Sequence, residues 1–179
     1  MAGIQDKIIL GLMMYADMSA YDIKKAIESS TAFFYNASMG SIHPALKKLV
    51  ANRYATVSQE IDNGRTRKVH SITEAGKSAY LSWLEQGLTV PQIRDETLVR
   101  LFFFGHLDKV QQKKHLAEHI NMLSQQIAAL EILRTQIAQI NIPKDMQEHA
   151  KFQQATLDYG LQYYRFSRDW YHKFVDDNF

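Results

Sequence analysis

The chain has 179 residues, 46% of them hydrophobic, and its formal net charge at pH 7 is only +2. This apolar content can fill a packed core and argues against a disordered protein. The absence of cysteine excludes disulfides, thiolate metal sites and a cysteine nucleophile. No apolar run reaches the ~18–20 residues that span a bilayer. We therefore expect a globular cytoplasmic protein with no membrane partner.

The first two helices are predicted from apolar spacing and a capping signal. Apolar residues at helical spacing predict a helix over residues 4–15. A turn at residues 16–18 follows. Ser19 and, three residues later, Asp22 form a box-like helix start, which predicts a second helix over residues 20–29.

The third helix is predicted over residues 40–52. Pro44 lies in its first turn, where a missing backbone N–H costs little. One apolar stripe of this helix would be buried. The side chains off that stripe are polar or basic: Ser41, His43, Lys47 and Lys48.

A β-hairpin and a fourth helix complete the first half. Segments 54–61 and 68–73 are rich in β-branched and aromatic residues and flank Asn63-Gly64, a strong hairpin signal. Thr73-Glu74-Ala75-Gly76 opens a helix that we expect to end near residue 86. Its inward-facing side chains are expected to be Tyr80, Leu81 and Leu84.

The second half of the chain predicts helices throughout, after a linker at residues 87–91. Helices are expected over residues 93–105, 108–140 and 144–175. The long middle helix carries a heptad stripe, which fits a dimer seam and fits packing on the last helix of the same chain equally well. The residues assigned to dimerisation are Leu116, Ile120, Leu123, Ile127, Leu130, Ile137 and Trp170.

The order helix, helix, helix, hairpin, helix is that of a winged helix-turn-helix. Residues 36–73 hold six Lys or Arg against two Asp or Glu, so positive charge is concentrated where phosphate contact requires it. The major groove admits one α-helix, and a basic hairpin tip suits a neighbouring phosphate track or the minor groove. The side chains expected to contact DNA are Tyr21, Lys24, Ser38, Ser41, His43, Lys47, Lys48, Asn63, Arg65, Arg67 and Lys68.

Several segments resemble the PadR family of transcriptional regulators. They are Ile9-Leu10-Gly11-Leu12, Ser19-Ala20-Tyr21-Asp22-Ile23, Gly40-Ser41-Ile42-His43-Pro44-Ala45-Leu46-Lys47-Lys48-Leu49 and Thr73-Glu74-Ala75-Gly76-Lys77. The run Arg94-Asp95-Glu96-Thr97-Leu98-Val99-Arg100-Leu101-Phe102-Phe103 resembles the helical half of a subgroup with phenolic-acid-responsive repressors and virulence activators. The chain has His43 where the family usually has tyrosine, and His70 where it usually has an aromatic residue.

The resemblance implies a homodimer, swapped through the C-terminal helices, on a palindromic operator, often with a small effector bound between the domains. The expected fold is mainly α, with a winged helix-turn-helix and two-stranded wing in residues 1–87 and a long-helix dimerisation domain in residues 88–179. The expected function is repression of transcription, relieved by a small aromatic or lipophilic effector. The alternative is a winged-helix protein-interaction scaffold without DNA readout, which the local positive charge disfavours.

Other patterns are weaker. Aromatic residues from Tyr159 to Phe174 could line an effector pocket, although an interhelical core or dimer interface is the commoner role for such rings. The residues that would bind an effector are not identified. His115 and His119 lie four residues apart, but no third ligand is evident and an exposed helix surface is the better interpretation. We find no catalytic set and expect no enzyme, cofactor or metal.

Overall fold

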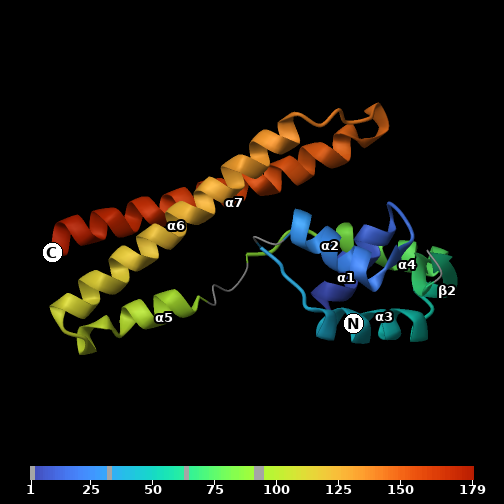
Figure 1. Cartoon of the computed structure of the whole chain (residues 1–179), viewed down its shortest axis with the longest axis horizontal. Coiled ribbons are helices and arrows are strands. Elements are labelled where there is room, and N and C mark those ends of the chain that lie inside the picture. The colour runs from blue at the N-terminus through green and yellow to red at the C-terminus, as the bar shows by residue number, and fades with distance from the viewer. Residues whose placement is uncertain (1–2, 32–33, 63–64, 91–94) are drawn as a thin grey trace. The chain divides into compact units, whose positions relative to one another are not determined.

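The structure is a computed structural model that describes residues 3–31, 34–62, 65–90 and 95–179 and is mainly helical (Figure 1). It divides into two compact units, residues 1–91 and 92–179. The boundary expected at residue 87 lies in the same connecting segment, between the last helix of the first unit and the first helix of the second. No helix of the described residues is long and apolar enough to cross a membrane.

The described residues of the first unit form four helices, and the starts of the second and the fourth confirm the capping signals. The Ser19 hydroxyl accepts from the Asp22 backbone N–H at 3.2 Å, and the Asp22 carboxylate accepts from the Ser19 N–H at 2.9 Å. Thr73 Oγ1 accepts from the Gly76 N–H at 3.0 Å. The helices are α1 (Ile4–Met13), α2 (Ala20–Ser30), α3 (Met39–Ala51) and α4 (Glu74–Leu84).

The sheet has three strands, one more than the predicted hairpin. It consists of β1 (Met18–Ser19), β2 (Ala55–Asp62) and β3 (Arg65–Ile72), antiparallel in the order β1-β3-β2. The expected turn at residues 16–18 is thus wrong at Met18, which pairs with His70 of β3. A strand of two residues is too short to show an alternating pattern. Its pairing is set by β3 and not by its own sequence. Asn63 and Gly64, the predicted hairpin turn, lie outside the described residues.

The core of the first unit lies between the helices and the sheet. Its fully buried side chains come mainly from α1, α2 and α3: Ile9, Leu10, Ile23, Ile27, Ile42, Leu46 and Leu49. Tyr80 of α4 packs against this core as expected, but Leu81 and Leu84 are exposed. Leu81 is turned about 100° from Tyr80 around the helix, and Leu84 is the last residue of α4.

The second unit is a long helical hairpin preceded by a short helix. Asp95 caps α5 (Glu96–Phe102) by accepting from the Thr97 N–H at 2.8 Å, so this helix starts later than predicted and ends before a 3₁₀ turn at Phe104–His106. The long helix α6 (Lys109–Ala138) follows. A second 3₁₀ turn (Lys144–Met146) then leads into α7 (Gln147–Asn178), which runs beyond the predicted end at residue 175.

The heptad stripe of α6 packs on α7 of the same chain. The two helices run side by side (Figure 1). Leu116, Leu123, Ile127 and Leu130 are buried, and Ile120 and Ile137 are half-buried. The four buried residues thus form part of the core of the intrachain hairpin, and their assignment to dimerisation stays a prediction. Trp170 is exposed and stacks on Phe174 with ring centroids 5.4 Å apart.

Candidate nucleic-acid interface

Helix α3 presents a polar face to solvent because its other face carries the core residues. Ser38 occupies the N-cap position without a side-chain cap hydrogen bond and is exposed, as are His43 and Lys47. At the other end, the Arg53 N–H donates to the Val50 carbonyl and the Tyr54 N–H to the Leu49 carbonyl, both at 2.9 Å. This is a Schellman ending. Arg53 occupies its left-handed position, with φ 59°.

Two contacts hold α3 against α1. Gln5 Nε2 donates to Ser41 Oγ at 3.0 Å, and Lys48 Nζ pairs with Asp6 Oδ2 at 2.7 Å. Asp6 is buried and also accepts from the Gly3 N–H at 3.0 Å. Lys48 is therefore paired with a buried carboxylate, although 48% of its own side chain is exposed. The contact of Lys48 with DNA stays a prediction, and any such contact would have to keep the pair with Asp6, because losing it would strand a buried carboxylate.

One carboxylate joins β3 to the start of α2. Asp22 Oδ2 accepts from the Ser19 N–H at 2.9 Å, from Ser19 Oγ at 2.7 Å and from Arg67 Nη2 at 3.0 Å. Burial raises the pKa of Asp22, but the Ser19 hydrogen bonds and the charges of Arg67 and Lys25 outweigh it and lower the pKa overall. The carboxylate therefore stays ionised and fixes the hairpin to the helix-turn-helix.

A cavity of about 840 Å³ lies between α2, α3 and the hairpin. Its floor is apolar, from Ala20, Met39, Leu46, Val50 and Val57. Its polar lining brings together five of the residues predicted to contact DNA, namely Tyr21, His43, Lys47, Arg67 and Lys68. No carboxylate is among the described residues that line it. The cavity is therefore flanked by cations from two elements that are distant in sequence.

His70 lines the same cavity and was not among the predicted contacts. Its side chain is 9% exposed, and its Nδ1 has no hydrogen-bond partner among the described residues. Burial lowers the pKa of His70, and His43 and Lys68 lower it further, against a hydrogen bond to the backbone of Met18. Alternation along the strand could have found it, since residues 68 and 70 share one face of β3.

The remaining predicted contacts are distributed around this cavity. Lys24 pairs with Glu28 on α2 at 3.3 Å. Ser41 donates to the Ser38 carbonyl at 2.9 Å while accepting from Gln5, so one lone pair remains for another donor. Arg65 begins β3, and its side chain, like the whole of Asn63, lies outside the described residues.

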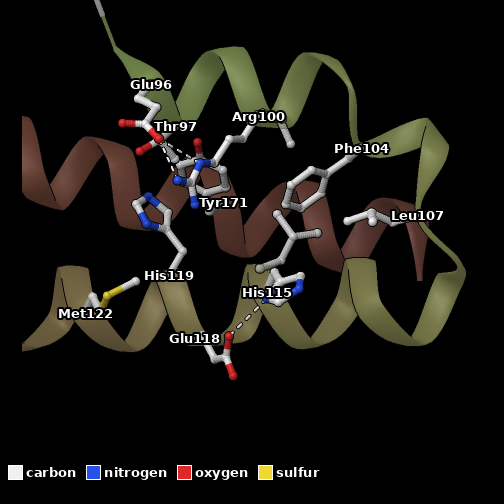
Figure 2. Close-up of a pocket in the computed structure, with 12 residues that line it drawn as sticks. Glu96, Thr97, Arg100, Phe104, Leu107, His115, Glu118, His119, Met122 and Tyr171 are labelled. Carbon is white, nitrogen blue, oxygen red and sulfur yellow. Dashed lines mark hydrogen bonds and ion pairs between the residues drawn. The ribbon is translucent and has the colours of Figure 1, made fainter.

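A second cavity, of about 550 Å³, lies within the second unit between α5, α6 and α7 (Figure 2). His119 and Tyr171 meet edge to face with ring centroids 4.6 Å apart. Burial lowers the pKa of His119, although the charge of Asp95 opposes it. The Arg100–Glu96 ion pair and the hydrogen bond between His115 and Glu118 are formed by residues that line the cavity.

The histidines and aromatic residues singled out in the sequence have different surroundings in the second unit. His115 pairs with Glu118 at 3.1 Å, and no group of three or more metal-binding side chains occurs within the described part of the chain. Tyr171 is buried at the cavity, whereas Tyr159, Tyr163 and Phe166 of the same helix are exposed. The exposed rings do not belong to the core of a single chain.

Two family comparisons cover most of the chain. Residues 9–81 match the transcriptional regulator PadR-like family, and residues 93–176 match the virulence activator alpha C-terminal family. The negative transcriptional regulator PadR of Bacillus subtilis is 28% identical over 103 residues, which are 56% of this chain. The aligned segment spans 57% of the length of that relative.

Solved structures share the fold. Bacillus subtilis PadR in complex with operator DNA superposes with a TM-score of 0.82 at 19% identity, covering 97% of this chain and 98% of the other. The Vibrio cholerae virulence activator AphA gives a TM-score of 0.76 at 23% identity, covering 97% and 96%. Bacillus subtilis PadR in complex with p-coumaric acid gives 0.76 at 19% identity, covering 97% and 98%. The fold is thus a winged helix-turn-helix followed by a long-helix unit, and the chain carries a domain of the PadR-like family of transcriptional regulators at residues 9–81 and a virulence activator alpha C-terminal domain at residues 93–176.

Proposed function

We propose that this protein is a sequence-specific DNA-binding repressor that acts as a homodimer on a palindromic operator and is released by a small effector. The observation that carries DNA binding is the cavity between α3 and the hairpin, where Lys47, Arg67, Lys68 and two histidines converge without a carboxylate among the described lining residues. The operator complex of Bacillus subtilis PadR, which has the same fold, supports this proposal.

The positions of α3 and the hairpin indicate a different role in DNA binding for each. The exposed face of α3 enters the major groove, where His43 and Lys47 reach base edges or nearby phosphates. Lys68 and the wing tip contact the backbone. The ion pair of Arg67 with Asp22 holds the wing at a fixed distance from α2, so both elements approach one duplex as a unit.

Salt dependence tests the cationic contacts. In fluorescence anisotropy with a duplex selected from a random library, Lys47→Ala and Lys68→Ala are each expected to weaken binding and to reduce the slope of log affinity against log salt by roughly 0.9. Lys151→Ala on α7, where the lysine is exposed and pairs with Glu148, serves as the matched control. If both test variants bind the duplex with the wild-type slope of log affinity against log salt, the proposed interface is contradicted. Failure to select any duplex favours the protein-interaction scaffold instead.

Dimerisation is supported by exposed apolar side chains of the second unit. Phe102, Tyr159, Phe166 and Trp170 are exposed in the single chain, although they are large and apolar. Sedimentation velocity is expected to give a dimer for the wild type and a shift toward monomer for Phe166→Glu. A wild-type monomer at the concentration that binds DNA contradicts the dimer. The exposed Gln153→Glu on the same helix controls for added charge.

The effector is proposed to bind the cavity of the second unit. Its volume of about 550 Å³ lies in the range of small-ligand sites, and Phe104, Tyr171 and Met122 offer apolar contacts beside the imidazole of His119 (Figure 2). Isothermal titration with p-coumaric acid, the compound bound in one Bacillus subtilis PadR structure, is the first test. Binding that is lost in Met122→Trp, which fills the cavity, supports this site. Equal binding by wild type and variant places the effector elsewhere.

A further inference from the structure

The first unit contains two histidines, and both face the DNA-contacting cavity. The chain has seven histidines, and within residues 1–91 these are His43 and His70. They come from α3 and β3, which are separate in sequence, and both line the cavity together with Lys47, Arg67 and Lys68. An anion beside a pair of imidazoles favours their protonated form, and the permanent cations around them disfavour it.

The surroundings of His70 disfavour its protonated form in the free protein. Lys68 of its own strand and His43 of α3 help to lower the pKa of His70, and Arg67 and Lys47 line the same cavity. The strands β1 and β2 pair Met18 and Val57 with it, and neither side chain carries charge. From α2 come Tyr21, which lines the cavity, and Asp22, whose carboxylate is held by Ser19 and Arg67.

A proton on Nδ1 of His70 would therefore lack an acceptor among the described residues and would add to a positive cluster. A DNA backbone phosphate over this cavity supplies the missing negative charge. This phosphate can contact His43 directly, because His43 is exposed. It also offsets the effect of Lys68 and His43 on the more deeply buried His70, whose pKa they lower. Because the phosphate interacts more favourably with imidazolium than with imidazole, binding and protonation must strengthen each other.

We propose that His43 and His70 form a proton-linked phosphate site on the DNA-contacting face, so that binding of duplex DNA takes up protons and tightens as pH falls. This inference rests on the proposed DNA-binding function. Each imidazole that changes from neutral to protonated on binding contributes a slope of up to about one in log affinity per pH unit. Affinity at constant salt is therefore expected to rise by roughly tenfold or more between about pH 8 and about pH 6.

Fluorescence anisotropy across this pH range tests whether these two histidines cause the pH dependence of DNA affinity. His43→Gln and His70→Gln each keep a neutral polar side chain, and each is expected to reduce the pH slope. The double variant is expected to bind with nearly constant affinity at every pH. His172→Gln, an exposed position on α7, should retain the wild-type slope. Since His70 is buried, thermal melting checks that its variant folds, and the exposed His43 variant tests the linkage independently.

Calorimetry counts the protons directly. The binding enthalpy of wild-type protein at about pH 7, measured in buffers of different ionisation enthalpy but without phosphate, is expected to show net proton uptake, and the double variant is expected to show less. Tight DNA binding without pH dependence overturns this inference and leaves the proposed function standing. So does a pH slope that persists unchanged in the double variant. Absence of DNA binding at every pH overturns the proposed function and this inference together.

Discussion

Gly76, which closes the Thr73-Glu74-Ala75-Gly76 segment, is expected to be intolerant of any side chain. A Cβ at this position would lie 2.1 Å from the Tyr54 carbonyl oxygen and 2.9 Å from Ile72 Cγ1. The same carbonyl accepts from the Thr73 N–H at 3.0 Å, so it cannot move away without losing the contact that starts α4. The clash is with backbone, which gives way less readily than a flexible side chain.

The sign of the Gly76→Ala effect distinguishes packing from helix propensity. Propensity alone favours alanine inside a helix by about 1 kcal/mol. Overpacking of this severity costs about 3 kcal/mol, which leaves a net loss of about 2 kcal/mol in the free energy of unfolding. For a unit of this size, that loss corresponds to a drop in melting temperature of roughly 8–16 °C.

Urea unfolding followed by Trp83 fluorescence, in a Trp170→Phe background, reports on the first unit by itself. Gly40→Ala is the matched control, because Gly40 is also in the first turn of a helix but its Cβ would meet only Ser38 Oγ, at 3.6 Å. The control is expected to be neutral or stabilising by up to about 1 kcal/mol. A Gly76→Ala protein as stable as the wild type would refute the packing argument.

Three further substitutions test contacts around the interface. Lys48→Ala strands the buried Asp6 carboxylate and is expected to cost about 1–3 kcal/mol in urea unfolding; its salt slope of DNA binding tests the predicted phosphate contact of Lys48, which an unchanged slope would contradict. Arg53→Gly relieves the φ of 59° and is expected to stabilise the protein by about 1 kcal/mol; a measured loss would contradict the strain. Because Asp22 has a lowered pKa, its contribution to stability is fully present above the unfolded carboxyl pKa of about 3.9 and is lost as pH falls through the folded value. Asp22→Asn is expected to cost about 1 kcal/mol at neutral pH and to flatten the acid limb of unfolding, whereas an unchanged limb would show that the ion pair with Arg67 has no energetic weight.

Features of the fold that depend on near neighbours could be predicted from the sequence. The capping box at Ser19 and the side-chain cap at Thr73 are contacts within three residues, so the residue types alone predict them. The two long strands follow from their β-branched and aromatic content, and the long C-terminal helices follow from apolar spacing. The family segments then agree with this order of elements.

Contacts between distant segments could not be predicted in the same way. The ion pair of Lys48 with Asp6 could not be predicted, because the two residues lie 42 positions apart in the sequence. The strand Met18–Ser19 exists because β3 offers an open edge, and nothing in its own two residues signals this. His70 joins the interface through the fold of the hairpin against α3. The heptad stripe fitted two partners, and the choice between them depends on three-dimensional packing.

The contacts from α1 to α3 limit how this protein could be redesigned to read another DNA sequence. Ser41 is hydrogen-bonded to Gln5 and Lys48 is paired with Asp6, so changing either residue of α3 also disturbs the helix behind it. A library at Ser38, His43 and Lys47 would vary exposed side chains without this coupling, whereas Ser41 and Lys48 would have to be varied together with their α1 partners. Part of the information that sets operator choice would then reside in the first helix of the chain, which need not touch a base.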